Sequence, residues 1–234
     1  MKFRILTLFP EIYPGPLEKS IIGKAFRKKK FSLQTYNIRN FSNFKSKKVD
    51  EKPFGGGAGM IIRADIMQRC LDYSLRDSKD IKYKILNLSP KGKKLEQNSV
   101  KDLLKYEEII IICGRYEGID QRFIDANNIE EISLGDYIIS CGDLAAFILV
   151  DSCVRLIPDV LGNKNSLTNE SFNENLLEHP HYTKPRTWKN LKVPSILFSG
   201  NHSKIDEWRE KKAKEITKKA RPDLWKLYKK KKEF

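Results

Sequence analysis

Three polar clusters in the sequence carry residues that could do chemistry, and each follows a short apolar run. They are Leu88–Lys94 (L-S-P-K-G-K-K), Cys113–Asp120 (C-G-R-Y-E-G-I-D) and Ser133–Asp143 (S-L-G-D-Y-I-I-S-C-G-D). Carboxylates suit proton transfer, and glycines let a backbone come close to a ligand. Any one cluster also fits a capped strand-to-helix turn with a surface ion pair. Three in succession favour a binding pocket.

The apolar runs predict the elements that position these clusters. Ile109–Cys113 is apolar on both faces, which is typical of a central parallel strand. Period and turn residues predict further strands over Phe3–Phe9, Phe31–Ile38, Tyr83–Leu88 and Glu131–Leu134. Gly135 closes the last strand, and Tyr137–Ser140 continues to Cys141–Gly142. Helices are predicted over Leu17–Lys30, Arg63–Arg76, Leu95–Tyr106 and Leu144–Leu156. This alternation predicts an α/β fold with a mostly parallel sheet, whose three polar loops meet at one edge.

The charge is concentrated at the two ends of the chain. The 234 residues carry a net charge of +15, with +9 in residues 1–60, −1 in residues 61–203 and +7 in residues 204–234. A neutral middle with basic ends favours a polyanion as partner, and nucleic acid is the leading candidate. A solvated lysine-rich tail is the alternative.

The rest of the composition narrows the class of protein. No apolar run reaches the roughly 20 residues of a membrane span, and the N-terminus lacks a signal-peptide pattern, so we expect a cytoplasmic protein without a membrane partner. Four cysteines without C-x-x-C spacing indicate buried thiols in a reducing compartment. With only three histidines, we expect no metal site.

The glycine cluster Gly55–Gly59 contains G-x-G-x-G, but it does not match the motif of a nucleotide-binding loop. A Rossmann loop follows an apolar strand, whereas this cluster follows the polar stretch Val49–Phe54. It predicts a flexible or close-approach loop. The sequence has no P-loop motif.

The chain divides into two predicted domains. An α/β domain spans 1–157, an aperiodic linker spans 158–171, and a helical domain spans 172–234. The last contains two predicted basic helices, Ser203–Ala220 and Pro222–Lys232.

Together these features resemble one known family. Matching stretches occur in order along nearly the whole chain: Phe9–Glu11, Gly55–Met60, Leu88–Gly92, Cys113–Asp120, Leu134–Tyr137, Val160–Gly162, His179–Pro185 and Leu197–His202. The sequence closely resembles bacterial tRNA (guanine-N1)-methyltransferases, members of the SPOUT class with a trefoil-knotted sheet. The resemblance implies methyl transfer from S-adenosylmethionine to N1 of the guanosine 3′ of a tRNA anticodon (position 37). It also implies a homodimer with the active site at the subunit interface, and no DNA partner.

The resemblance also assigns roles to residues. It implies cofactor contacts from three loops, at Leu88, Ser89, Pro90, Gly92, Gly114, Tyr116, Leu134, Gly135, Asp136, Tyr137, Ile138, Ile139 and Gly142. Guanine N1 carries a proton, so methylation needs a carboxylate base, and charge that develops on O6 needs a cationic or backbone donor. The family pattern implies Glu170 as the base, Arg155 as the cation and Glu117 beside the guanine edge.

Several positions depart from the family pattern. The family usually has Asp at 170, Gly at 141, Glu at 143 and Pro at 58 and 145, where this chain has Glu170, Cys141, Asp143, Ala58 and Ala145. None of these changes removes a reacting group. Two alternatives stay open: a non-catalytic RNA-binding module, and a knotted methyltransferase that acts on ribose or ribosomal RNA.

Overall fold

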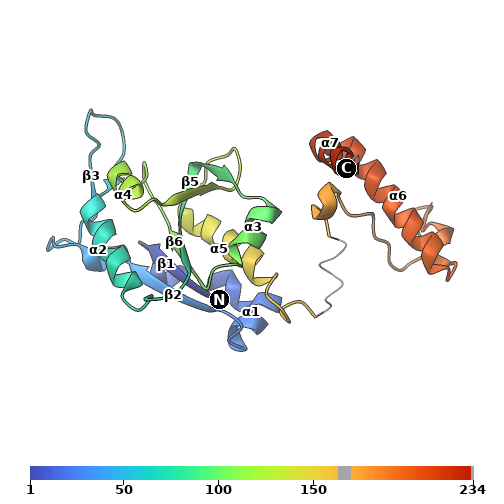
Figure 1. Cartoon of the computed structure of the whole chain (residues 1–234), viewed down its shortest axis with the longest axis horizontal. Helices are drawn as coiled ribbons and strands as arrows, with labels where there is room; N and C mark the ends of the chain where they lie inside the picture. Colours follow the sequence, from blue (N-terminus) through green and yellow to red (C-terminus); the bar gives the residue numbers. More distant parts are fainter. Residues whose placement is uncertain (163–169, 233–234) are drawn as a thin grey trace. The chain divides into compact units, whose positions relative to one another are not determined.

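The computed structural model describes residues 1–162 and 170–232. The chain forms two compact units, Met1–Gly162 and Asn163–Phe234 (Figure 1). Of the predicted linker, residues 163–169 lie outside the described residues. Each unit is described by itself below.

The first unit is built on a five-stranded parallel sheet. Its strands lie in the order β2 (Ser32–Asn37), β1 (Lys2–Thr7), β6 (Glu108–Ile112), β5 (Tyr83–Lys94) and β7 (Glu130–Ser133). Every residue of β6 is buried, because strands and helices cover it on all sides. The predicted parallel α/β sheet is therefore confirmed, with the isoleucine run near its centre.

Helices cover both faces of the sheet (Figure 1). One face packs against α1 (Ser20–Arg27), α3 (Gln97–Leu103) and α5 (Gly142–Val154). The other packs against α2 (Ala64–Leu75) and α4 (Gln121–Ala126). Alternate residues of β6 point into these two separate apolar clusters, which explains why the strand has no polar face.

One sequence prediction at the carboxyl edge of the sheet was wrong in detail. β5 does not end at Leu88 but runs to Lys94, with a register shift in which both Leu88 and Lys93 lie opposite Ile132. After β7, Tyr137–Ser140 forms no strand, and Ile138 is 80% exposed.

Short elements complete the fold. Two antiparallel hairpins pair β3 (Asp50–Glu51) with β4 (Ile61–Ile62), and β8 (Thr187–Trp188) with β9 (Leu191–Lys192). Short 3-10 helices span Pro10–Ile12, Gly15–Glu18, Ile38–Phe41, Asn173–Asn175 and Ser195–Phe198. The strands of both hairpins are too short to show the period of a strand, so the sequence pattern does not predict them.

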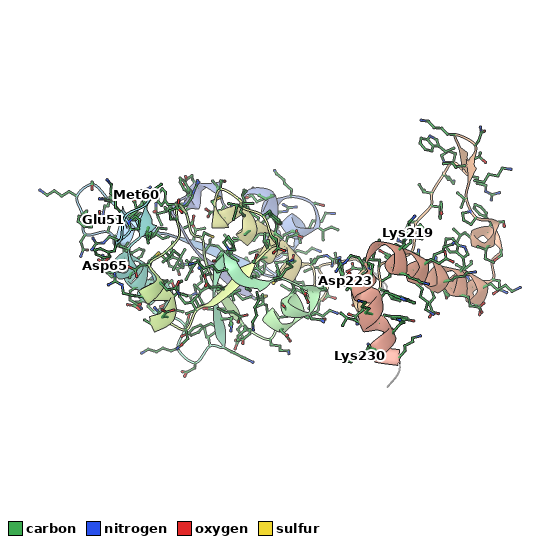
Figure 2. The ribbon with its side chains drawn as sticks, turned by 90° about the horizontal axis from the view of Figure 1, so that it is seen from above. Glu51, Met60, Asp65, Lys219, Asp223 and Lys230 are labelled. Atoms are coloured by element: carbon green, nitrogen blue, oxygen red, sulfur yellow. The ribbon has the colours of Figure 1, made fainter. Side chains whose placement is uncertain are left out.

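The second unit is led by two basic helices, α6 (His202–Ala220) and α7 (Pro222–Lys232), as the sequence predicts. The Asn201 side chain caps α6 by accepting a hydrogen bond from the Lys204 amide at 3.1 Å. Asp223 and Lys230 mark α7 in Figure 2, and Arg221 forms an ion pair with Asp223 where α7 begins. Ile205, Thr217 and Tyr228 are the buried side chains of these helices.

A buried ion pair lies at the amino edge of the sheet. Arg4 is 0% exposed, and its guanidinium donates to Glu108 Oε1 at 3.0 Å and to the Ser74 carbonyl. The Ser78 hydroxyl donates to the other Glu108 oxygen at 2.7 Å. Burial raises the pKa of Glu108, but hydrogen bonds from Arg4 and Ser78 and the charge of Arg4 outweigh it, so the net pKa is lowered.

We predict that Glu108→Gln lowers the free energy of unfolding of the first unit by about 3–5 kcal/mol at pH 7, because it leaves Arg4 buried without its counter-charge. Since the folded pKa of Glu108 is lowered, its contribution is present above the unfolded value of 4.5 and is lost as the pH falls through the folded value. The variant should therefore lose less stability than the wild type on acidification below that value. Urea denaturation followed by far-UV circular dichroism, at neutral and acidic pH, measures both effects.

Glu130→Gln is the matched control, since Glu130 pairs with Lys84 at a partly exposed site and should contribute less than about 1 kcal/mol. Trp188, Trp208 and Trp225 are the only tryptophans of the chain, and all belong to the second unit. Their fluorescence transition should not move. Equal destabilisation by both substitutions would contradict the assignment.

Candidate active site

A cavity of about 360 Å³ opens at the carboxyl edge of the sheet, where the three polar clusters meet. Such a volume suits a small-molecule ligand. Of the residues for which the resemblance implies cofactor contacts or catalysis, the lining includes Leu88, Ser89, Pro90, Gly114, Tyr116, Glu117, Leu134, Gly135, Tyr137, Ile138, Ile139 and Gly142. The structure thus brings together residues from all three loops.

The first wall is the excursion of β5. Because Leu88 and Lys93 both face Ile132, the residues between them bulge out of the ladder, and Ser89 and Pro90 line the cavity. Gly92 lies behind this wall instead of lining it. A Cβ there would come 2.3 Å from the Glu131 carbonyl carbon, so only glycine allows β5 to pass β7 this closely.

The second wall is a backbone contact between the loops that follow β6 and β7. The Gly142 amide donates to the Gly114 carbonyl at 3.0 Å. A Cβ on Gly142 would lie 2.9 Å from the Cys113 Cα and the Gly114 nitrogen. The start of α5 therefore rests directly on the end of β6, and this contact sets the depth of the cavity.

A buried polar cluster supports that contact from behind. Asp143 Oδ1 accepts hydrogen bonds from the Thr7 hydroxyl at 2.6 Å and the Tyr13 hydroxyl at 3.1 Å. The Tyr13 oxygen also lies 3.6 Å from Cys113 Sγ. Burial raises the pKa of Tyr13, and the adjacent Cys113 and Asp143 add to the rise, so Tyr13 stays a neutral donor. The cluster ties β1, β6 and α5 together. The family departure at Asp143 was visible in the sequence, but its partners Thr7 and Tyr13 were not.

Arg115 is another residue of the site whose role the sequence pattern did not predict. Its guanidinium lies 4.5 Å from the centre of the Phe9 ring and donates to the Ser140 carbonyl at 3.3 Å. It lines the cavity and connects the Phe9–Glu11 stretch to the third loop. The only sequence signal was its place between Gly114 and Tyr116.

The other residues with implied roles lie outside the cavity. Asp136 points outward and forms an ion pair with Lys94, whose Nζ lies 3.2 Å from Asp136 Oδ2. Arg155 follows the last turn of α5, about 20 Å along the helix from Gly142 at 1.5 Å per residue. Burial raises the pKa of the neighbouring Asp151, and the charge of Arg155 opposes the rise. Glu170 belongs to the second unit, where it lines a surface hollow with residues of α6.

Comparison with known proteins identifies the family. The family model described as tRNA (Guanine-1)-methyltransferase TrmD matches residues 1–227. The chain belongs to this family. A tRNA (guanine-N(1)-)-methyltransferase of Pelagibacter ubique strain HTCC1062 is 48% identical over 227 residues, which is 97% of this chain and 98% of the relative. Proteins of the same name from Brucella ovis and Brucella melitensis biotype 1 are each 49% identical over 224 residues, 96% of this chain and 91% of theirs.

The cavity fits the S-adenosylmethionine that the family uses as methyl donor. Leu88, Pro90, Leu134 and Ile139 supply apolar walls, and Gly114 and Gly142 line the cavity with backbone that carries no side chain. Ser89, Glu117 and Gln121 add polar groups at the rim. Adenosine and methionine together need this mixture of apolar surface and backbone hydrogen-bonding groups.

Among the described residues, no group of three or more His, Cys, Asp and Glu side chains could hold a metal ion. None of the described helices has the length and apolar character to cross a membrane.

We predict that Gly142→Ala weakens S-adenosylmethionine binding by about tenfold or more, since the new methyl group must push α5 away from Gly114. Isothermal titration calorimetry with the cofactor measures the loss. Gly162→Ala is the matched control, because a Cβ there meets nothing within 4 Å, and its affinity should equal that of the wild type. Unchanged binding by the Gly142 variant would mean that this contact does not shape the site.

Proposed function

We propose that this protein is an S-adenosylmethionine-dependent tRNA (guanine-N1)-methyltransferase that modifies the guanosine 3′ of the anticodon, at position 37. The match of the family model to residues 1–227 carries the proposal, and relatives of that name are aligned over nearly the whole chain. The cavity supports it independently, because it gathers residues from three separate loops into one site of suitable size. A purely structural RNA-binding protein has no need of such a cavity.

The reaction requires from the protein a base for the N1 proton, a cation near O6 and a contact to the edge of the guanine. When bound, S-adenosylmethionine supplies the methyl group as an electrophile. Guanine N1 becomes nucleophilic as its proton leaves, and we assign that proton to the Glu170 carboxylate. Negative charge that develops on O6 is stabilised by the guanidinium of Arg155. Glu117 lines the cavity and holds the edge of the guanine.

We further propose that the active site is shared between the two subunits of a homodimer. Within one chain Arg155 is separated from Gly142 by the full length of α5, so it reaches a cofactor cavity more easily in a partner subunit. Leu144 and Ile148 are half exposed and four residues apart on α5, and Ile138 is 80% exposed nearby in the sequence. Two exposed apolar side chains on the same face of α5 support burial of this face against a second copy.

The finer fold assignment is also a proposal. We infer that the segment from Leu88 to Gly142 forms the trefoil knot of the SPOUT class. The close backbone approaches of Gly92 to Glu131 and of Gly142 to Cys113 support it, because a threaded chain needs segments that pass without intervening side chains. Such knots are rare exceptions among folds.

We assign the second unit to tRNA binding and the whole protein to the cytoplasm. The basic helices α6 and α7 suit the phosphate backbone of the substrate. Cys70, Cys113 and Cys153 are free and buried, which fits a reducing compartment.

We expect incubation with methyl-labelled cofactor and a tRNA transcript to yield 1-methylguanosine on nucleoside mapping. A transcript in which the guanosine 3′ of the anticodon is changed to adenosine should receive no label. Label on a ribose hydroxyl, or only on ribosomal RNA, would favour another knotted methyltransferase. Absence of cofactor binding would favour the non-catalytic RNA-binding module.

The base assignment is tested by Glu170→Gln in the same assay. The substitution should lower the single-turnover rate by about 10²–10⁴-fold, the usual contribution of a positioned base. Cofactor affinity should stay unchanged, since Glu170 is not part of the cofactor cavity. Glu170→Asp keeps a carboxylate and should retain much of the activity. A near wild-type rate for the Gln variant would move the role of base to Glu117.

The shared site predicts complementation between two variants when the S-adenosylmethionine concentration lies between the Kd of the wild type and the Kd of the Gly142→Ala variant. Glu170→Gln removes the base, and Gly142→Ala leaves its cofactor cavity largely empty under that condition. After subunit exchange, a heterodimer of the two should regain up to about one working site, because one cavity and one Glu170 stay intact. Activity that stays at the level of the separate variants would contradict sharing, provided that mass spectrometry shows the heterodimer.

A further inference from the structure

Phe54 is the most exposed of the large apolar side chains described, with 98% of its surface accessible. It lies in the nine-residue connection 52–60 that joins β3 to β4 and projects from the body of the first unit near the β3 label (Figure 1). Gly55 and Gly56 follow it, and a Cβ at either would meet nothing within 4 Å. With 98% of its surface accessible, the Phe54 ring is open on both faces.

The base of this hairpin is fixed against the loop that carries Glu117. The Glu117 amide donates to the Met60 carbonyl, the Ile62 amide donates to the Gly118 carbonyl, and both bonds are 3.0 Å long. A Cβ on Gly59 would lie 2.5 Å from Glu117 Cγ, so these two residues touch. Figure 2 shows Met60 and Glu51 together at this end of the first unit.

Phe54 is therefore held near the proposed target. Phe54 and Gly59 are five positions apart in the sequence, and an extended chain of that length spans at most about 17 Å. Glu117 is the residue that we assign to the edge of the target guanine. An exposed ring within this reach lies where the neighbouring nucleotides of the same RNA loop must pass.

The surroundings of the ring favour RNA over protein. Residues 39–63 contain six Lys or Arg against two Asp or Glu, and Lys45, Lys47 and Lys52 are exposed. Phe44 is a second aromatic residue in this region. The Arg63 guanidinium lies 5.0 Å from the centre of its ring. Exposed aromatic rings among cations are the pattern of single-stranded nucleic-acid binding, in which bases stack on the rings.

We propose that Phe54 is a stacking platform for an unpaired base adjacent to the target guanosine, an inference that rests on the proposed function. The ring positions the tRNA loop, while Glu117 at the base of the same hairpin contacts the target. Phe54 is a positioning residue, because it touches a flanking base and not the reacting atoms. The backbone freedom of Gly55 and Gly56 lets the ring follow the base into place.

The test compares Phe54→Ala, Phe54→Leu and Phe54→Trp. Loss of one stacked base corresponds to about 5- to 150-fold in kcat/KM for tRNA, equivalent to 1–3 kcal/mol. We expect this loss in both the Ala and the Leu variants, expressed mainly in KM, and recovery in the Trp variant. Cofactor affinity and the melting temperature should equal those of the wild type. Tyr83→Ala is the control, since Tyr83 is an exposed aromatic residue at the opposite edge of the sheet.

A fluorescence measurement tests stacking without methyl transfer. A tRNA with 2-aminopurine on either side of the target guanosine should be quenched at one position by the wild type and the Trp variant, but not by the Leu variant. Quenching by a wild-type protein that transfers no methyl group would contradict the proposed function and support this inference. Wild-type kinetics in the Leu variant would overturn the inference. A weakened dimer on sedimentation of the Ala variant would also overturn it, because the ring would then pack on a second copy.

Discussion

The site depends on one constraint: three segments of backbone pass one another without side chains between them. At Gly142 the start of α5 donates directly to Gly114, and at Gly92 the strand β5 lies on the backbone of β7. A single methyl group at either place would occupy space that main-chain atoms already fill. The cavity exists because these segments meet so closely that their loops curve around a common space. Fold and binding site are thus consequences of the same packing.

Buried polar groups at the amino edge of the sheet affect stability, and those at the carboxyl edge position the loops of the cavity. At the amino edge, Arg4 and Glu108 form an ion pair far from the cavity, whose removal we expect to affect stability. At the carboxyl edge, Asp143 accepts from Thr7 and Tyr13 directly behind the cofactor loops. Its second oxygen is buried without a hydrogen-bond partner among the described residues. This cluster holds the loops in place at a cost in stability, since an unsatisfied buried oxygen destabilises the fold.

The sequence predicted the regular parts of the fold because burial on both faces leaves a local signal. The isoleucine run of β6 and the helix α5 carry it, whereas α2, α6 and α7 show the period of a helix with one apolar face. The sequence pattern also placed the three loops at one edge of the sheet, since parallel strands share a direction. It predicted a turn after Leu88, whereas β5 continues to Lys94 there because the chain pairs with β7 again. Contacts such as Arg115 with Phe9 join residues 106 positions apart, and no local pattern encodes them.

The double pairing of Ile132 has an evolutionary consequence. Because Leu88 and Lys93 both lie opposite this residue, the sheet fixes the two ends of the excursion and not its contents. The pairing of β5 with β7 therefore places no limit on the size and polarity of residues 89–91, which line the cavity and are limited only by the ligand that it binds. Gly92 alone in this stretch is held by its neighbour's backbone. Substitutions at positions 89–91 can change one wall of the cavity during evolution without changing the strand register around it.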